Sequence, residues 1–260
     1  MTPLVSIITP LYNSEVFLED TITSILNQTY SNWELLLIDD CSTDGTEALA
    51  FRYRDNYPNI RVFKNQSNSG AAVSRNKGIA EAKGVFIAFL DADDLWKINK
   101  LEVQIKFMQA NNCSVSYTSY EQIDEFSKPL HKLVKVLPKL SYGKILKSNY
   151  IGNLTGVYNA SVLGKIIVPN LRKRQDWLMW LSAIKKSGKP ALGVPESLAY
   201  YRVRRDSISS NKMALLKHNY WVYKKGLGYS TLKSFYRMLV FIWEQFFVKA
   251  KLIVSTKPQK

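Results

Sequence analysis

Short apolar runs alternate with amphipathic segments through the first part of the chain. Runs rich in β-branched and aliphatic residues at positions 4–9, 34–38, 60–63 and 85–90 predict buried strands. We expect Pro10 to stop the first of these strands. Apolar residues at helical spacing predict helices over residues 14–27, about 43–54 and 71–82, with Ser14 and Thr43 as candidate caps.

This alternation predicts an α/β fold. Strands that are apolar throughout are buried on both faces, which favours a mostly parallel, Rossmann-like sheet with helices on either side. Polar residues follow the first, second and fourth strands directly. In open α/β sheets ligands bind at the carboxyl ends of the strands, so residues 1–110 are predicted to form a nucleotide-type binding half.

The pattern after residue 110 is less regular. A helix is expected from about 97 to 110, a strand near 114–120 and a basic, loop-rich stretch up to Pro138. A helix over 174–187, a strand over 198–203 and a polar loop over 204–212 follow. Neither an internal repeat nor a low-complexity linker is present, so residues 1–230 are predicted to form one compact domain with halves 1–110 and 111–230.

The tail, residues 231–260, differs from the rest of the chain. Aromatic and aliphatic residues dominate positions 235–254, but charged residues interrupt them before they reach the ~18–20 apolar residues of a spanning helix. Two interpretations stay open. One is an amphipathic helix lying on an anionic membrane surface. The other is a helix packed on the domain or in a dimer interface.

Composition narrows the choice of function only partly. Hydrophobic residues make up 46% of the 260 residues, so a sizeable core can form, and the net charge is +15. Such a chain attracts phosphates of nucleic acids, nucleotides or membranes, and the charge alone does not select among them. Cys41 and Cys113 are expected to be free thiols, and residues 4–11 are too short for a secretory signal, so we expect a cytoplasmic protein.

The strongest chemical signal is the acidic segment 91–94, Asp-Ala-Asp-Asp, directly after the fourth predicted strand. Acids crowded at a strand end repel one another, and a hard divalent ion such as Mg²⁺ or Mn²⁺ relieves this repulsion with carboxylate and phosphate oxygens. The ion would neutralise a diphosphate as it leaves. The alternative is a solvated acidic turn in which Asp93 or Asp94 caps the next helix.

Other polar residues are weaker candidates. Of Asp39 and Asp40, one could bond to a base or ribose while the other orders the turn. Arg75 could place a guanidinium near a phosphate. Asp176 lies in a basic and aromatic setting at a predicted helix start, which suits either a general base or a helix cap.

Several other chemistries do not fit. His131 and His218 lack partners at zinc-binding spacing. The chain has no G-x-S-x-G motif and no Gly-rich phosphate loop, which argues against a hydrolase, a P-loop NTPase or a dehydrogenase. No compact nucleic-acid-binding signature is present.

Ordered blocks across about residues 4–205 resemble the family 2 glycosyltransferases of the GT-A fold. The blocks are Pro10-x-Tyr12-Asn13, Ser24-Ile25-Leu26-x-Gln28-Thr29, Ile38-Asp39-Asp40-x-Ser42-x-Asp44-Gly45-Thr46, Asn68-x-Gly70, Arg75-Asn76-x-Gly78-Ile79, Phe89-Leu90-Asp91-Ala92-Asp93-Asp94 and Gln175-Asp176-x-x-x-Trp180-Leu181. Residues 199–212 strengthen a likeness to bacterial enzymes that build O-antigen, capsule or teichuronic acid chains.

The resemblance implies roles for the residues of these blocks. Tyr12 would stack on the nucleobase and Asp40 would bond to its edge. Asp91 and Asp93 would reach ribose and a Mn²⁺ or Mg²⁺ ion, with Asp93 as the principal metal ligand. Asp176 would be the general base of an inverting displacement. The nucleotide-sugar site as a whole would comprise Pro10, Tyr12, Asn13, Asp40, Arg75, Asp91 and Ala92.

The chain departs from the family pattern twice. Gln175 stands where relatives commonly have Glu, and residues 202–206 contain arginines where relatives often carry a His. We therefore predict that one of these arginines, Arg204 first, contacts the diphosphate.

The resemblance implies transfer of a sugar from a nucleoside diphosphate sugar, most simply a UDP-hexose, to a lipid-linked glycan during surface polysaccharide synthesis. It implies an enzyme peripheral to the inner face of the cell membrane, with residues 111–230 as the acceptor half. The alternatives are an inactive nucleotide-sugar-binding relative and a basic nucleic-acid-binding protein.

Overall fold

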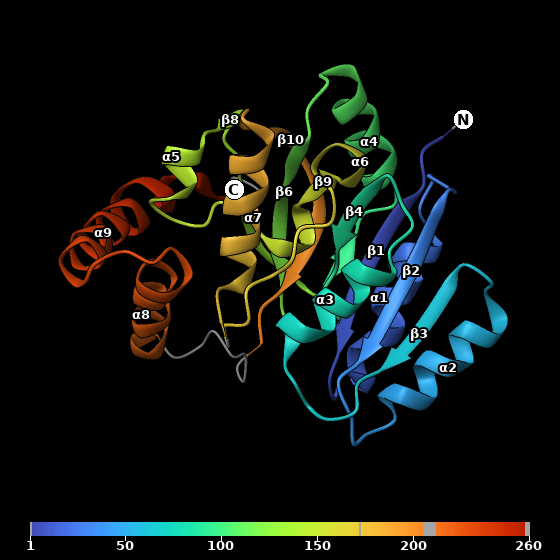
Figure 1. The fold of residues 1–260 in the computed structure, drawn as a ribbon. Helices are drawn as coiled ribbons and strands as arrows, with labels where there is room; N and C mark the ends of the chain where they lie inside the picture. Colours follow the sequence, from blue (N-terminus) through green and yellow to red (C-terminus); the bar gives the residue numbers. More distant parts are fainter. Residues whose placement is uncertain (1, 172, 205–211, 258–260) are drawn as a thin grey trace.

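Four apolar runs form the parallel centre of the sheet. The computed structural model describes residues 2–171, 173–204 and 212–257. In it the strands β1 (Val5–Leu11), β2 (Trp33–Asp39), β3 (Ile60–Lys64) and β4 (Phe86–Phe89) lie in the order β3-β2-β1-β4, all parallel (Figure 1). Ile7 is in register with Leu35 on one side and Ala88 on the other. The predicted α/β class is confirmed.

Alternating side chains of these strands enter two cores. Val5, Ile7 and Leu35 pack on one face with α1 (Glu15–Leu26), α2 (Thr46–Asn56) and α4 (Lys100–Ala110). Ile8, Leu36 and Phe89 pack on the other with α3 (Ala71–Glu81) and α7 (Gln175–Ser187). This alternation follows from the two-residue period of a strand. β1, β2 and β4 are therefore covered on both faces, as their mainly apolar sequences predict, while β3 at the edge is only partly buried.

The expected element ends need correction. β1 does not stop at Pro10 but runs through it to Leu11; its ladder with β4 ends at Ile8, so Pro10 pairs on one side only. Helix α2 begins at Thr46, three residues after Thr43, because the Asp44 side chain accepts the Thr46 amide and orders the turn first. Ser14 precedes α1 but makes no side-chain cap, since its hydroxyl donates to the Tyr12 carbonyl.

Beyond α4 the sheet becomes mixed. Its elements are β5 (Leu95–Trp96), β6 (Val115–Ile123), β7 (Pro129–Val134), β8 (Lys139–Leu140), α5 (Tyr142–Ile145), η1 (Asn153–Thr155), β9 (Val157–Asn159), α6 (Ala160–Leu163), α7 and β10 (Ala191–Arg202). β9 lies antiparallel between β4 and β6, and β10 pairs parallel with β6.

The stretch before Pro138, expected to be a loop, contains β7, which pairs with β6 as a hairpin. β10 begins seven residues earlier than expected, because bulges interrupt its apolar pattern.

The tail packs against the domain. It comprises α8 (Lys212–Trp221), η2 (Val222–Gly226), α9 (Thr231–Trp243), η3 (Glu244–Val248), η4 (Lys249–Leu252) and β11 (Ile253–Ser255). The ring of Phe241 lies 5.8 Å from that of Trp177 of α7 in a tilted arrangement, and β11 pairs antiparallel with β7 at the edge of the sheet. One face of the tail is therefore packed on the domain, as the second of the two interpretations of its sequence predicts. Within the described residues, no helix is long and apolar enough to cross a membrane.

Candidate active site

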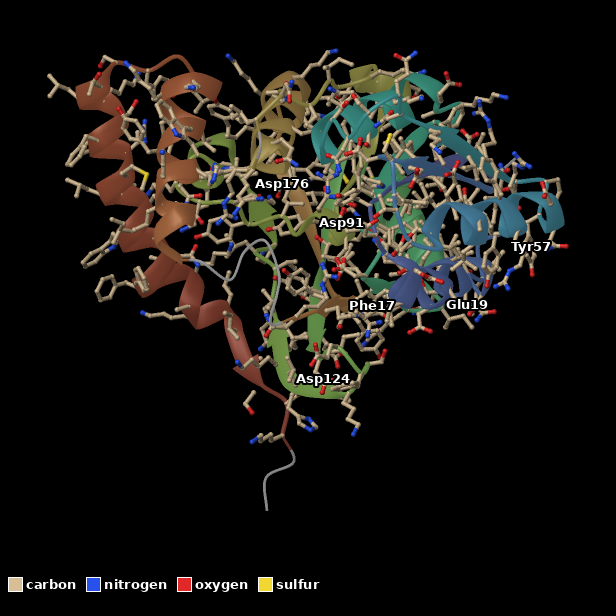
Figure 2. The ribbon with its side chains drawn as sticks, turned by 90° about the horizontal axis from the view of Figure 1, so that it is seen from below. Phe17, Glu19, Tyr57, Asp91, Asp124 and Asp176 are labelled. Carbon is tan, nitrogen blue, oxygen red and sulfur yellow. The ribbon has the colours of Figure 1, made fainter. Side chains whose placement is uncertain are left out.

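The acidic segment 91–94 lies where β4 ends beside the carboxyl end of β1. Figure 2 looks onto this face of the molecule, and in that view Asp91 lies near the centre, with Asp176 between it and the C-terminal helices. Asp94 is fully buried and accepts the Arg202 amide at 2.9 Å. Burial and the neighbouring Asp93 and Asp91 raise the pKa of Asp94 well above its usual range. Asp94 therefore supports the loop, and α4 is not capped by it.

The two other acids of this segment each face an arginine. Arg75 of α3 places its guanidinium 2.6 Å from Asp91 Oδ1, and the Nε of Arg204 lies 3.0 Å from Asp93 Oδ2. Burial raises the pKa of Asp93, Arg204 opposes the shift and Asp91 adds to it. The segment is thus an anionic pair balanced from within the protein by two cations.

The carboxylate oxygens of Asp91 and Asp93 are suitable ligands for a divalent ion such as Mg²⁺ or Mn²⁺. Asp91 and Asp93 remain partly exposed, with side chains 36% and 25% accessible. Such ions take one or two carboxylates and complete their shell with water and substrate phosphates. In agreement with this incomplete protein set, the described residues contain no group of three or more acids, histidines or cysteines that could enclose a metal. Arg204 and a metal would compete for the same Asp93 oxygen.

The predicted base-binding residue Asp40 has protein partners. Its Oδ1 accepts from Asn65 at 2.7 Å and from the Ser69 amide at 2.9 Å, and its Oδ2 accepts from the Gly70 amide at 2.7 Å. Asp40 is 3% exposed. It therefore orders the loop before α3, and only the free lone pairs of its carboxylate remain for a ligand. Its neighbour Asp39 accepts the Ser42 amide, as expected for a turn.

The other predicted nucleotide residues lie around this crevice in different environments. Tyr12 follows β1 with 51% of its surface exposed, so its ring is accessible for stacking. Pro10 is half-buried at the end of β1. Asn13 has a φ of 46° and accepts the Thr43 amide through its side chain, which ties the end of β1 to the turn after β2. Ala92 points into the core and its carbonyl accepts from Thr21, so its side chain is not on the ligand surface.

Asp176 occupies the first turn of α7. Its Oδ2 accepts a hydrogen bond of 2.8 Å from the Asn149 side chain, and it does not cap the helix, because Arg174 holds that position. Asn153, four residues after Asn149, donates a hydrogen bond of 3.3 Å to Asp91 Oδ1. The segment 149–153 thus connects the acidic pair to the predicted base.

A buried lysine supports this connecting segment. Lys100 of α4 is fully buried, and its ammonium donates to Gln104 at 2.5 Å and to the Thr155 carbonyl of η1 at 3.5 Å. Burial lowers the pKa of Lys100 to about 7. Gln104 also donates to the Thr155 carbonyl, at 3.0 Å, so η1 is fixed from inside the core.

Three residues of this site were missed by the sequence reasoning. Asn149 and Asn153 stand in no recognisable motif, and only the folded chain brings them to Asp176 and Asp91. Arg202 was considered only as an alternative to Arg204. It is 3% exposed, and its Nε donates to the Asp93 carbonyl at 2.8 Å. The available signal was its place as the last residue of a strand that is otherwise free of basic residues. Residues 205–211 of the predicted polar loop lie outside the described residues.

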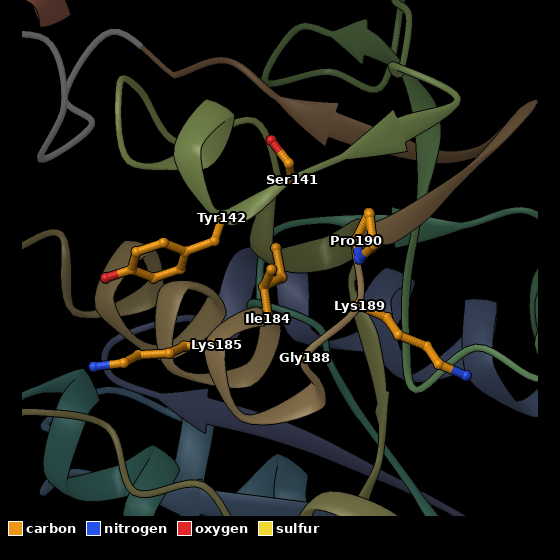
Figure 3. A pocket seen from close by; sticks show the side chains of 7 residues that line it. All are labelled: Ser141, Tyr142, Ile184, Lys185, Gly188, Lys189 and Pro190. Carbon is orange, nitrogen blue, oxygen red and sulfur yellow. The ribbon is translucent and has the colours of Figure 1, made fainter.

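A separate hollow lies at the other end of α7. It has a volume of about 330 Å³ and is lined by Ser141, Tyr142, Ile184, Lys185, Gly188, Lys189 and Pro190 (Figure 3). None of these residues carries a carboxylate, and the first of them on α7, Ile184, comes eight residues after Asp176. At about 1.5 Å per residue this places the two roughly 12 Å apart along the helix. The hollow is therefore not the site of the acidic chemistry.

Comparison with known proteins adds to this geometry. The sequence model of glycosyl transferase family 2 matches residues 6–165. The chain is 44% identical to TuaG of Bacillus subtilis strain 168, over 86% of this chain and 88% of that protein, whose name assigns it provisionally as a teichuronic acid biosynthesis glycosyltransferase. It is 42% identical, over 84% of each chain, to the Escherichia coli UDP-Glc:alpha-D-GlcNAc-diphosphoundecaprenol beta-1,3-glucosyltransferase WfgD.

Solved structures share the fold. TarS 1-349 of S. aureus in complex with UDP-GlcNAc superposes with a TM-score of 0.72 at 21% identity, covering 93% of this chain and 73% of that one. The mannosyltransferase PcManGT from Pyrobaculum calidifontis, in complex with GDP-Man and Mn²⁺, gives a TM-score of 0.71 at 17% identity, covering 97% and 72%. These likenesses confirm the GT-A fold predicted from the ordered motifs.

Proposed function

This chain belongs to glycosyl transferase family 2, and we propose that it moves a hexose from a UDP-sugar to a lipid-linked glycan with inversion at the anomeric carbon. That the protein is a glycosyltransferase follows from its family. The donor, the acceptor and the stereochemistry are our proposals. The observation that carries the proposed reaction is the segment 149–153, whose asparagines contact Asp91 at one end and Asp176 at the other, while the donor and acceptor classes draw on the relatives.

The proposed division of labour uses two ends of one crevice. Asp93 and Asp91 would hold Mn²⁺ or Mg²⁺, which supplies neutralisation of the diphosphate when bound. Tyr12 would stack on the base, while Asp40, Pro10 and Asn13 shape its pocket. Asp176 would take the proton from the acceptor hydroxyl, oriented for this by the Asn149 amide. Direct displacement needs no protein nucleophile.

The acceptor proposal draws on the relatives. WfgD is named for a glucose donor, UDP-Glc, and a diphosphoundecaprenol-linked N-acetylglucosamine acceptor. TuaG is named for synthesis of a cell-surface polymer. We propose the same classes of donor and acceptor here, with residues 1–110 as the donor half, 111–230 as the acceptor half and 231–260 as a tail toward the inner membrane surface.

The proposal is tested by release of UDP from a panel of UDP-sugars in the presence of Mn²⁺. We expect slow release without acceptor, and loss of about 10²-fold or more in Asp93→Ala. Glu19→Gln, on the exposed face of α1, is the matched control and should release UDP at the wild-type rate. Binding without release would instead support an inactive nucleotide-sugar-binding relative, and salt-sensitive binding of RNA or DNA would favour the nucleic-acid alternative.

A further inference from the structure

The tail brings a lysine to the predicted base. The ammonium of Lys249, in η4, donates to the backbone carbonyl of Asn149, whose side chain donates to Asp176. Burial and Arg174 lower the pKa of Lys249 to about 8, while Asp176 opposes this shift. The three charged groups are thus close enough to interact, and Lys249 is still mostly protonated at neutral pH. Only one of its three donors is used by Asn149.

Arg174 provides a second cation at the same place. It immediately precedes α7 in a left-handed conformation, with φ 67° and ψ 13°. A non-glycine residue in this region is strained, and such residues concentrate at binding sites. Its Nε is buried and has no hydrogen-bond partner. A buried donor without a protein acceptor is rare in folded proteins, and a ligand oxygen or a water would satisfy it.

The position of Lys249 is fixed by the packing of the tail. Glu244 accepts from the Tyr150 hydroxyl at 2.5 Å and pairs with Lys144 at 2.5 Å, and Gln245 accepts from Ser148 at 3.1 Å. These partners lie in the same stretch that carries Asn149. These hydrogen bonds and the ion pair therefore hold the tail against the segment that contains Asn149, the partner of Asp176.

The opposite face of the tail is apolar and exposed. α9 and η3 present Leu239, Trp243, Phe246 and Phe247 to the outside, each more than half exposed, along the flank of the molecule in Figure 1. Lys251, which is exposed, follows three residues after the end of η3, so a cation lies beside the apolar face. An aromatic face with a lysine beside it matches the boundary between acyl chains and phosphates of a membrane.

We propose that Lys249 and Arg174 bind the phosphate of a lipid-linked glycan acceptor, while the apolar face of α9 and η3 lies in the membrane that carries its lipid chain. Both side chains donate strong, charge-assisted hydrogen bonds to phosphate oxygens. An acceptor held there by its phosphate presents its sugar to Asp176. The inference rests on the proposed function, because it assigns the acceptor of that reaction.

A pair of matched acceptors tests it. One is N-acetylglucosamine diphosphate esterified to an undecyl chain, and the other is undecyl N-acetylglucosaminide, which lacks phosphate. KM and kcat are measured for both with wild type, Lys249→Met, Lys249→Arg and Lys106→Met, the last being an exposed lysine of α4 that serves as the control. Binding of each glycolipid in phosphatidylcholine vesicles is measured as well, since it needs no donor. Arg174→Gln repeats the test from a different element.

We expect Lys249→Met to raise KM and weaken vesicle binding for the diphosphate acceptor by about 10-fold or more, with little change for the phosphate-free one. Lys249→Arg should restore most of the loss, and Lys106→Met should resemble wild type. Equal losses on both acceptors would overturn the proposal and show that Lys249 only positions Asn149. The absence of any loss in Lys249→Met would also overturn it. Failure of the proposed function shows up separately, as absence of UDP release by wild type.

Discussion

The two ends of the crevice are built in different ways. On the donor side, Asp39 ends the parallel strand β2, Asp40 follows it, and residues 91–94 come one residue after β4, so the strands themselves place these acids. On the acceptor side, Asp176 meets Asn149 across 27 residues, and Asn149 meets Lys249 across 100. A donor site made at strand ends tolerates variation elsewhere in the chain, whereas the acceptor site depends on how the second half and the tail pack together. The acceptor side is where related enzymes would diverge most easily.

The largest expected effect separates the two ends chemically. Asp176→Asn keeps the size of the side chain but removes the base, so transfer to an acceptor should fall by about 10³-fold. Release of UDP without acceptor should persist, because the acidic pair at residues 91–94 is untouched. Rates of transfer and of release are measured side by side, with exposed Asp55→Asn as control. A parallel loss of both activities would mean that the two ends do not act separately.

A smaller effect tests the packing of the tail. Phe241 is 7% exposed and contacts Trp177, whereas Phe246 is 67% exposed. Phe241→Ala should lower the free energy of unfolding by about 3 kcal/mol, because it leaves a cavity at α7. Phe246→Ala should change it by less than about 0.5 kcal/mol. Denaturant unfolding of both variants checks this, and equal values would show that α9 does not depend on its contact with α7.

The smallest effect concerns Arg204. It pairs with Asp93 in this structure, and the sequence predicts that it contacts the diphosphate. Arg204→Ala should raise the donor KM by about 10-fold, in line with the loss of one charge-assisted hydrogen bond. KM and kcat for the UDP-sugar are the measurement. Unchanged values of both would remove Arg204 from the donor side and leave it as a partner of Asp93 alone.

How far the sequence predicted the molecule differs between the halves. β1 to β4 and the helices between them were predicted within a few residues, because β1, β2 and β4 are buried on both faces and their sequences are mainly apolar. β7 was taken for a loop, since a strand near the sheet edge with exposed polar positions such as His131 and Lys132 carries little hydrophobic signal.

The sequence by itself determined the family, the α/β class and the position of the acidic pair, because these depend on local periodicity and on motifs within single loops. Only the tertiary structure decided the partners. It buries Asp94 under Arg202, joins Asp91 to Asp176 through residues 149–153 and carries Lys249 to the base. The physical reason is that such contacts depend on how distant elements pack. No spacing along the chain encodes that packing, and a side chain's charge says nothing about which distant residue will balance it.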